Sequence, residues 1–234
     1  MQCGSLSLLS SVAPGKFGIF ESLITPMTNT AYLHQLRTPS ATDPLRVLVS
    51  ACLTGACCGF DGTPYGSYPS VGSLLHHPAV RLVSFCPEEY AFGTPREICD
   101  IHGGSGMDVL DGKAKVLTQT GKDWTSGMLR ASEKMLQLAV REAVDLAIMM
   151  DISAACGSQV IYAGSRLAEN KKYQAGAGVC AAQLIRNGFY VISQRDYASL
   201  EILHAKIDPG YVVNPEARDH QDTEWYRDYF SRSG

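Results

Sequence analysis

Three cysteines in this sequence occupy positions typical of metal ligands. Cys52, Cys86 and Cys156 are each followed by turn-forming residues, in the segments CLTG, CPEE and CGSQ. Cysteines that only fill a core usually lie inside an apolar run, so these three indicate a site. Three converging thiolates can hold zinc with an open fourth position, or three irons of a cubane cluster whose fourth iron is free. The spacing of the cysteines does not decide between the two metals.

The segments before these cysteines predict the strands that would bring the three thiols together. Residues 46–52, 80–86 and 145–151 are short apolar runs of the kind that form buried strands. The first two runs end in cysteine, and the third is followed within five residues by Cys156. In a parallel sheet the carboxyl ends of the strands line one edge, where ligands bind, so distant cysteines can converge there.

Helical patterns between and after these runs predict the helices that a parallel sheet requires. The clearest helix covers roughly 124–143, where apolar side chains recur at helical spacing and capping residues precede them. Further helices over 178–187 and 197–207, with a last strand over 189–193, complete the pattern. We therefore expect an α/β fold, a single Rossmann-like domain with a mainly parallel sheet flanked by helices.

The chain divides into three parts by composition. Residues 1–44 are rich in Ser, Thr, Pro and Gly without a sustained period, so we expect an irregular N-terminal extension. Residues 45–209 hold the α/β domain, and 210–234 form a polar and aromatic tail that we expect to dock on this domain or on a partner. A chain of 234 residues with 45% hydrophobic side chains can bury one large core, which agrees with a single domain.

Charge and apolar patterning exclude several classes of protein. The formal net charge is −3 without any run of like charges, so we expect no long nucleic acid as a partner. No apolar stretch is long enough to cross a bilayer and the start is not that of a secretory signal, so we expect a cytoplasmic protein without a membrane partner. In a reducing compartment the eight cysteines are core residues, metal ligands or catalytic thiols rather than disulfides. The expected partner is a small molecule, and the oligomeric state stays open.

Six motifs in a fixed order resemble those of the thiouracil desulfidase family. They are SACLTG, FDG at 60–62, CPEE, GTPRE at 93–97, MDVLDGKAKV at 107–116 and CGSQVIY at 156–162, and the match spans roughly residues 46–195. The resemblance implies that Cys52, Cys86 and Cys156 bind a [4Fe–4S] cluster. It also implies that the iron without a protein ligand captures the sulfur of a thiocarbonyl base, after which water replaces sulfur at the carbon.

Two polar residues near the cysteines are candidates for the proton transfers of such a hydrolysis. Glu88 could activate water, since a carboxylate in a partly dry cleft can acquire a suitable pKa; the alternative is that it caps a helix or pairs with Arg96. Its neighbour Glu89 is the weaker candidate for activating water and is expected to be solvated. Ser153 could position the base or pass a proton, and its alternative role is that of an ordinary turn serine. The family commonly has SPSCG where this chain has SAACG, which speaks against a mechanism with two serines.

The segment after the first cysteine holds candidate substrate contacts. Asp61 could bond a ring N–H of the base, although its place before a glycine also fits a turn. Tyr65 or Tyr68, in a loop rich in Gly and Pro, could stack on a planar ligand. The family usually carries an arginine before its YDG motif, whereas this chain reads CCGFDG. We expect the adjacent Cys57 and Cys58 to be small neutral residues or a sulfur relay.

These observations predict a [4Fe–4S]-dependent desulfidase that removes sulfur from a thiolated base or nucleoside, such as 2-thiouracil, and releases sulfide. The alternative is a non-catalytic iron–sulfur or zinc protein that stores or senses metal or sulfur. A zinc hydrolase acting on an ordinary base is a third possibility, but the HxE and CxxC pattern of the zinc deaminases is missing from this sequence.

Overall fold

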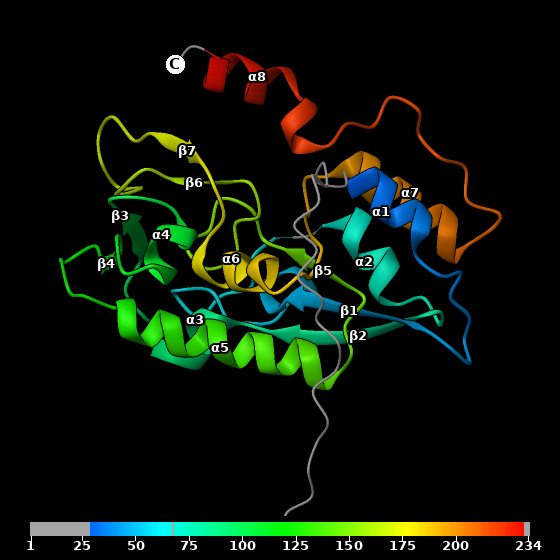
Figure 1. Ribbon diagram of the computed structural model, residues 1–234, viewed down its shortest axis with the longest axis horizontal. Helices are drawn as coiled ribbons and strands as arrows, with labels where there is room; N and C mark the ends of the chain where they lie inside the picture. The colour runs from blue at the N-terminus through cyan, green and yellow to red at the C-terminus, as the bar shows by residue number, and fades with distance from the viewer. Residues whose placement is uncertain (1–28, 67, 232–234) are drawn as a thin grey trace, which may run out of the picture.

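A parallel sheet of four strands forms the centre of the fold (Figure 1). The structure is a computed structural model that describes residues 29–66 and 68–231. The strands run in the order β2-β1-β5-β8 and all neighbours are parallel. Their bounds are Leu45–Ser50 for β1, Val80–Phe85 for β2, Leu146–Met149 for β5 and Val191–Ser193 for β8. The predicted α/β class with a mainly parallel sheet is confirmed.

Helices cover both faces of this sheet because successive strand residues point to opposite sides. Leu48 and Met149 face one apolar core, whereas Val47 and Ile148 face the other. The first core is covered by α3 (Pro87–Phe92), α4 (Gly106–Leu110), α5 (Thr125–Arg141) and α6 (Val179–Arg186). The second is covered by α1 (Asn29–Gln35), α2 (Pro69–Leu75) and α7 (Tyr197–Ile207). Figure 1 shows α1, α2 and α7 on one side of the sheet and α3 and α5 on the other.

The long helix α5 forms where the spacing of apolar residues predicts it. Met128, Met135 and Ala139 recur at intervals of seven and four residues along one face and are fully buried in the first core. The carboxylate of Asp123 accepts the backbone N–H of Thr125 at 3.0 Å and so satisfies one of the free donors at the start of the helix.

Two antiparallel hairpins extend the domain beyond the sheet. The first pairs β3 (Cys99–His102) with β4 (Lys115–Thr118), and the second pairs β6 (Val160–Tyr162) with β7 (Tyr173–Ala175). The remaining helical segments are η1 (Ala51–Thr54), η2 (His220–Asp222) and α8 (Glu224–Ser231). None of the helices within residues 29–66 and 68–231 is both long and apolar enough to cross a membrane.

The two ends of the described chain are more ordered than the sequence indicates. Residues 29–35 lie within the predicted irregular extension, yet they form α1, which packs against α7 and buries Leu33 completely. Residues 1–28 of that extension lie outside the described residues. Within the predicted tail, residues 220–222 and 224–231 are helical. The tail docks on the α/β domain, one of the two arrangements expected of it.

Truncating Leu33 tests whether α1 belongs to the folded core. Leu33→Ala should lower the free energy of unfolding by about 2–5 kcal/mol, because it removes a fully buried side chain and leaves a cavity. Val140→Ala on α5 is the control, since Val140 is 63% exposed and should change stability by less than about 0.5 kcal/mol. Urea unfolding measures both, and an unchanged midpoint for Leu33→Ala would show that α1 is not part of the core.

Candidate metal centre

A cavity of about 630 Å³ opens at the carboxyl ends of the strands. The register aligns Ser50 with Phe85 and Met149 with Ser193, so the strands end at nearly the same level. The chain leaves β1 toward β2 on one side, whereas β5 and β8 lie on the other side of β1. Such a change of direction leaves a crevice above the strand ends, which is where ligands bind in open α/β sheets.

The three predicted ligands all line this cavity. Cys52 lies on η1 directly after β1, Cys86 is the N-terminal cap of α3 directly after β2, and Cys156 lies in the loop after β5. The structure therefore brings together three residues that are up to 104 positions apart in the sequence (156 − 52 = 104). A fourth thiol, that of Cys58, lines the same cavity.

The thiols in the cavity influence one another's protonation. The Cys52 thiol shares a hydrogen bond with Cys58. This bond and burial raise the pKa of Cys52, whereas the same bond lowers the pKa of Cys58 to about 7 against the opposing effect of burial. Burial raises the pKa of Cys86 to about 12 and also raises the pKa of Cys156. Several thiolates in one partly dry cavity repel each other, so a bound metal would favour their charged forms.

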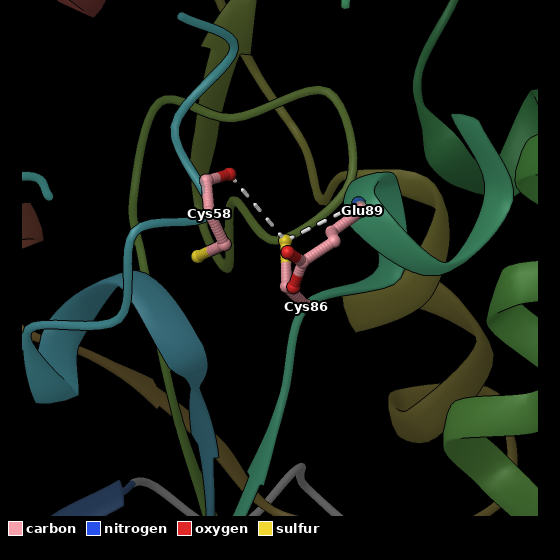
Figure 2. A group of neighbouring side chains, drawn as sticks. All are labelled: Cys58, Cys86 and Glu89. Carbon is pink, nitrogen blue, oxygen red and sulfur yellow. Dashed lines mark hydrogen bonds between the residues drawn. The ribbon is translucent and has the colours of Figure 1, made fainter. Parts of the chain in front are cut away.

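A tighter group within this cluster could hold one metal ion. One ligand atom each from Cys58, Cys86 and Glu89 lies within 4.8 Å of the other two. Figure 2 shows the Cys86 sulfur between the other two residues: it lies 4.0 Å from the backbone oxygen of Cys58 and accepts the N–H of Glu89 at 3.4 Å. Thiolates bound to the same zinc lie about 4 Å apart, whereas thiolates on different irons of a cubane lie farther apart. Cys86 thus belongs to two candidate ligand sets.

Glu88 lines the cavity and is held by an almost fully buried arginine. The Arg96 guanidinium donates to Glu88 Oε2 at 3.1 and 3.3 Å, which is the pairing considered as the alternative role of Glu88. Arg96 also donates to the backbone oxygens of Cys58 and Gly59, at 2.9 and 3.4 Å. The other carboxylate oxygen, Oε1, accepts from Ser153 Oγ at 3.4 Å. The salt bridge therefore orients Glu88 and leaves Oε1 on the side of Ser153.

Ser153 organises the loop that carries Cys156. Its hydroxyl accepts the backbone N–H groups of Ala155 and Cys156 at 3.2 and 3.1 Å, which is the turn role considered for it, while it donates to Glu88. The preceding Ile152 has a φ of 55°, which is strained for a β-branched residue. Gly178 packs so closely on the loop that a Cβ there would lie 2.6 Å from the Ser153 carbonyl oxygen. The position of Cys156 is therefore strongly constrained.

The predicted substrate contacts divide into two groups. Tyr65 and Tyr68 line the cavity, in positions where they could reach a planar ligand. Asp61 is not among the cavity-lining residues; its carboxylate accepts the N–H and hydroxyl of Thr63 at 2.9 and 2.7 Å, and these bonds lower its pKa. The geometry places Asp61 in the turn role, and the expected bond to a ring N–H has no support from this position.

Several cavity residues carry no signal that distinguishes them in the sequence. Arg166 lies 5.2 Å from the ring of Tyr162 and pairs with the buried Asp100. His220 and Trp225 reach the same cavity from η2 and α8. For Cys58 a signal did exist, because it follows Cys52 by six residues in a loop closed by glycines. Adjacent cysteines are too close to form a standard chelating pair, however, so the sequence does not separate Cys58 from its exposed neighbour Cys57.

Comparisons with known proteins identify the family of this chain. The model of the family described as 2-thiouracil desulfurase matches residues 47–196. The uncharacterized protein YbbK of Bacillus subtilis (strain 168) is 36% identical over 151 residues, which cover 64% of this chain and 96% of YbbK. Among solved structures, the [4Fe-4S]-dependent thiouracil desulfidase TudS is similar with a TM-score of 0.55 and 29% identity, over 69% of this chain and 98% of that one. The resemblance inferred from the six motifs is confirmed, and this chain belongs to the 2-thiouracil desulfurase family.

Proposed function

We propose that this protein is a desulfidase that hydrolyses a thiolated nucleobase or nucleoside, such as 2-thiouracil, to the oxo base and hydrogen sulfide. The observation that carries the proposal is the convergence of Cys52, Cys86 and Cys156 in one cavity with Glu88 and Ser153 beside them. Water supplies the oxygen and both hydrogens of the products, so the reaction balances without an oxidant or a reductant. Membership of the family and the likeness to TudS support the same activity.

The donor set suits an iron–sulfur cluster. Cys52, Cys86 and Cys156 would hold three irons of a [4Fe–4S] cluster, since all three line one cavity and follow three different strands. When bound, such a cluster supplies a soft Lewis-acidic iron that prefers the sulfur of a thiocarbonyl group to oxygen. Burial disfavours the thiolate forms of Cys86 and Cys156. A bound metal would offset this cost and the repulsion between the thiolates.

Glu88 is our proposed general base for the attacking water. Arg96 fixes Oε2 of Glu88, so Oε1 keeps a constant direction beside Ser153. A carboxylate held in this way can accept a proton from water in the cavity and return it to the departing sulfide. Ser153 orients Glu88 through its hydroxyl and positions Cys156 through two backbone hydrogen bonds.

A second candidate function rests on the close group of Cys58, Cys86 and Glu89. Ligand atoms within 4.8 Å of one another suit a single ion such as zinc, in a protein that binds metal without catalysis. The two ligand sets differ in a way that mutation can separate, because Cys86 is common to both whereas Cys156 belongs only to the first and Cys58 only to the second.

Paired cysteine variants distinguish the two ligand sets. After anaerobic reconstitution, Cys156→Ala should lose the brown colour, most of the bound iron and sulfide release from 2-thiouracil, because a buried ligand is removed. Cys58→Ala is the matched control and should keep its iron. Iron and acid-labile sulfide analysis, together with a sulfide-release assay, measure these outcomes. The reverse pattern, with one zinc per chain lost in Cys58→Ala, would support the second candidate.

Removing the charge of Glu88 tests its role as the base. Glu88→Gln keeps the shape of the side chain and should lower kcat by about 100-fold or more while the iron content stays unchanged, because proton transfer by a positioned group contributes at least that much. Glu89→Gln, the adjacent and exposed carboxylate, should keep kcat within about twofold. Equal activity of both variants, measured by sulfide release, would remove Glu88 from the mechanism.

Alkylation of the metal-free protein tests the electrostatics of the cavity. At pH 8 the pKa of about 7 leaves Cys58 mainly as thiolate, whereas the pKa of about 12 keeps Cys86 protonated. Since the thiolate is the nucleophile, Cys58 should react with iodoacetamide at least about tenfold faster than Cys86. Peptide mapping by mass spectrometry gives the two rates. Reconstitution with iron and sulfide should then protect Cys86, and equal rates in the metal-free protein would contradict the assigned shifts.

A further inference from the structure

The segment that follows α7 contributes to the cavity although it lies outside the family match. The match ends at residue 196, whereas His220, Thr223 and Trp225 from the later segment line the same cavity as the cysteines. Figure 1 shows α8 at one end of the molecule, beside β7. The ring of Trp225 contacts the ring of Tyr173 on β7 edge to face, with centroids 5.5 Å apart.

Buried polar contacts fix this segment in place. The carboxylate of Asp219 accepts the N–H and hydroxyl of Ser199 in the first turn of α7, at 2.8 and 2.7 Å. The backbone N–H of His220 donates to Asp196 at 3.0 Å, and the side-chain Nδ1 lies 2.5 Å from Oδ2 of the buried Asp151. Both partners in each of these contacts are buried, so the segment is part of the folded domain.

His220 lines the cavity and has a ring nitrogen without a partner. Its side chain is 5% exposed, and Nε2 is buried without a hydrogen-bond partner among residues 29–66 and 68–231. A buried ring nitrogen without a partner is costly, so a ligand in the cavity that bonds to it would gain binding energy. The imidazole stacks on the indole of Trp225, with centroids 5.3 Å apart and planes 12° apart.

Trp225 presents aromatic surface next to this nitrogen. Its side chain keeps 41% of its surface exposed although it contacts His220, Tyr173 and Tyr229. Those rings hold the indole in a fixed orientation. A fixed aromatic ring beside a single polar atom is suited to a planar heterocycle, which offers both a π-face and ring nitrogens or oxygens.

We propose that His220 and Trp225 form a recognition wall for the base, with the heterocycle packed against the indole and a ring heteroatom hydrogen-bonded to Nε2 of His220. This inference rests on the proposed function, because it assigns the binding of the same substrate. It places a specificity determinant in residues that the family match does not include.

Kinetics of full-length variants test the wall. Trp225→Ala should raise KM for 2-thiouracil about fivefold to fiftyfold with less change in kcat, as expected from the loss of base stacking, and Trp225→Phe should restore most of the affinity. His220→Asn keeps an amide nitrogen at the place of Nδ1, beside Asp151, but removes Nε2, and should raise KM about threefold to tenfold. Glu224→Gln, an exposed position on the same helix and outside the cavity lining, should leave KM within twofold.

A binding measurement separates failure of the wall from failure of the proposed function. The chain has two tryptophans, and Trp124 stacks on Phe92 outside the cavity lining. In full-length Trp124→Phe protein, uracil, the oxo product, should therefore quench the remaining fluorescence of Trp225. Quenching supports the wall even if no sulfide is released. Sulfide release with unchanged KM in Trp225→Ala and His220→Asn, or absence of quenching by uracil, would overturn it.

Discussion

The site depends on one constraint, namely that the carboxyl ends of β1, β2 and β5 lie at the same level in the sheet. The parallel register aligns Ser50 with Phe85, so the residues that follow these strands leave the sheet at the same height. Cys52 and Cys86 follow within two residues and one residue of these strand ends, and a short loop after β5 carries Cys156 to the same cavity. A shift of one strand by one residue would turn its apolar side chains to the wrong core, so the packing that stabilises the sheet also fixes the place of the thiols.

Close packing then holds the loops against the repulsion of the groups they carry. The buried guanidinium of Arg96 binds backbone oxygens of the loop with Cys58 and the carboxylate of Glu88 on α3. On the other side, Gly178 leaves no room for the Cys156 loop to move toward α6. Preorganisation of this kind matters because a metal ligand or a base displaced by an ångström loses much of its effect.

The sequence predicted the parts of the fold that follow a strong local pattern. Long amphipathic α5 was placed within two residues at each end, and α7 was placed at its observed bounds, because helical spacing of apolar residues is a local signal. The antiparallel pairs β3–β4 and β6–β7 give no comparable signal, since their strands have only three or four residues. Helix α1 was hidden for a related reason: seven residues with one fully buried side chain give too little periodicity to detect.

The candidate site shows the same division between local and distant information. Each of the three cysteines was recognisable from the turn that follows it, and each lines the cavity. For Asp61 the sequence left a substrate contact and a turn role open, and in the structure its carboxylate accepts the hydroxyl of Thr63 within that turn. His220 and Trp225 could not be found from sequence, because only the folding of the tail onto β7 and α7 brings them near the thiols.

The surface beneath the tail has polar groups that depend on it. Asp151 and Asp196 are buried carboxylates, and burial raises the pKa of Asp196 to about 6. The side chain of His220 contacts the first carboxylate and its backbone N–H bonds to the second. Without the tail, each carboxylate would lose its contact with His220, and a buried polar group that loses a partner costs stability. The proposed ligands, Glu88 and Ser153 all lie within residues 47–196, so the chemistry belongs to the part shared with the family. Within the domain, Asp151 accepts the backbone N–H of Val160, and Asp196 accepts from Gln159 and Ser193. His220 adds one contact to each carboxylate from outside the family match, so buried polar groups join the tail to the domain.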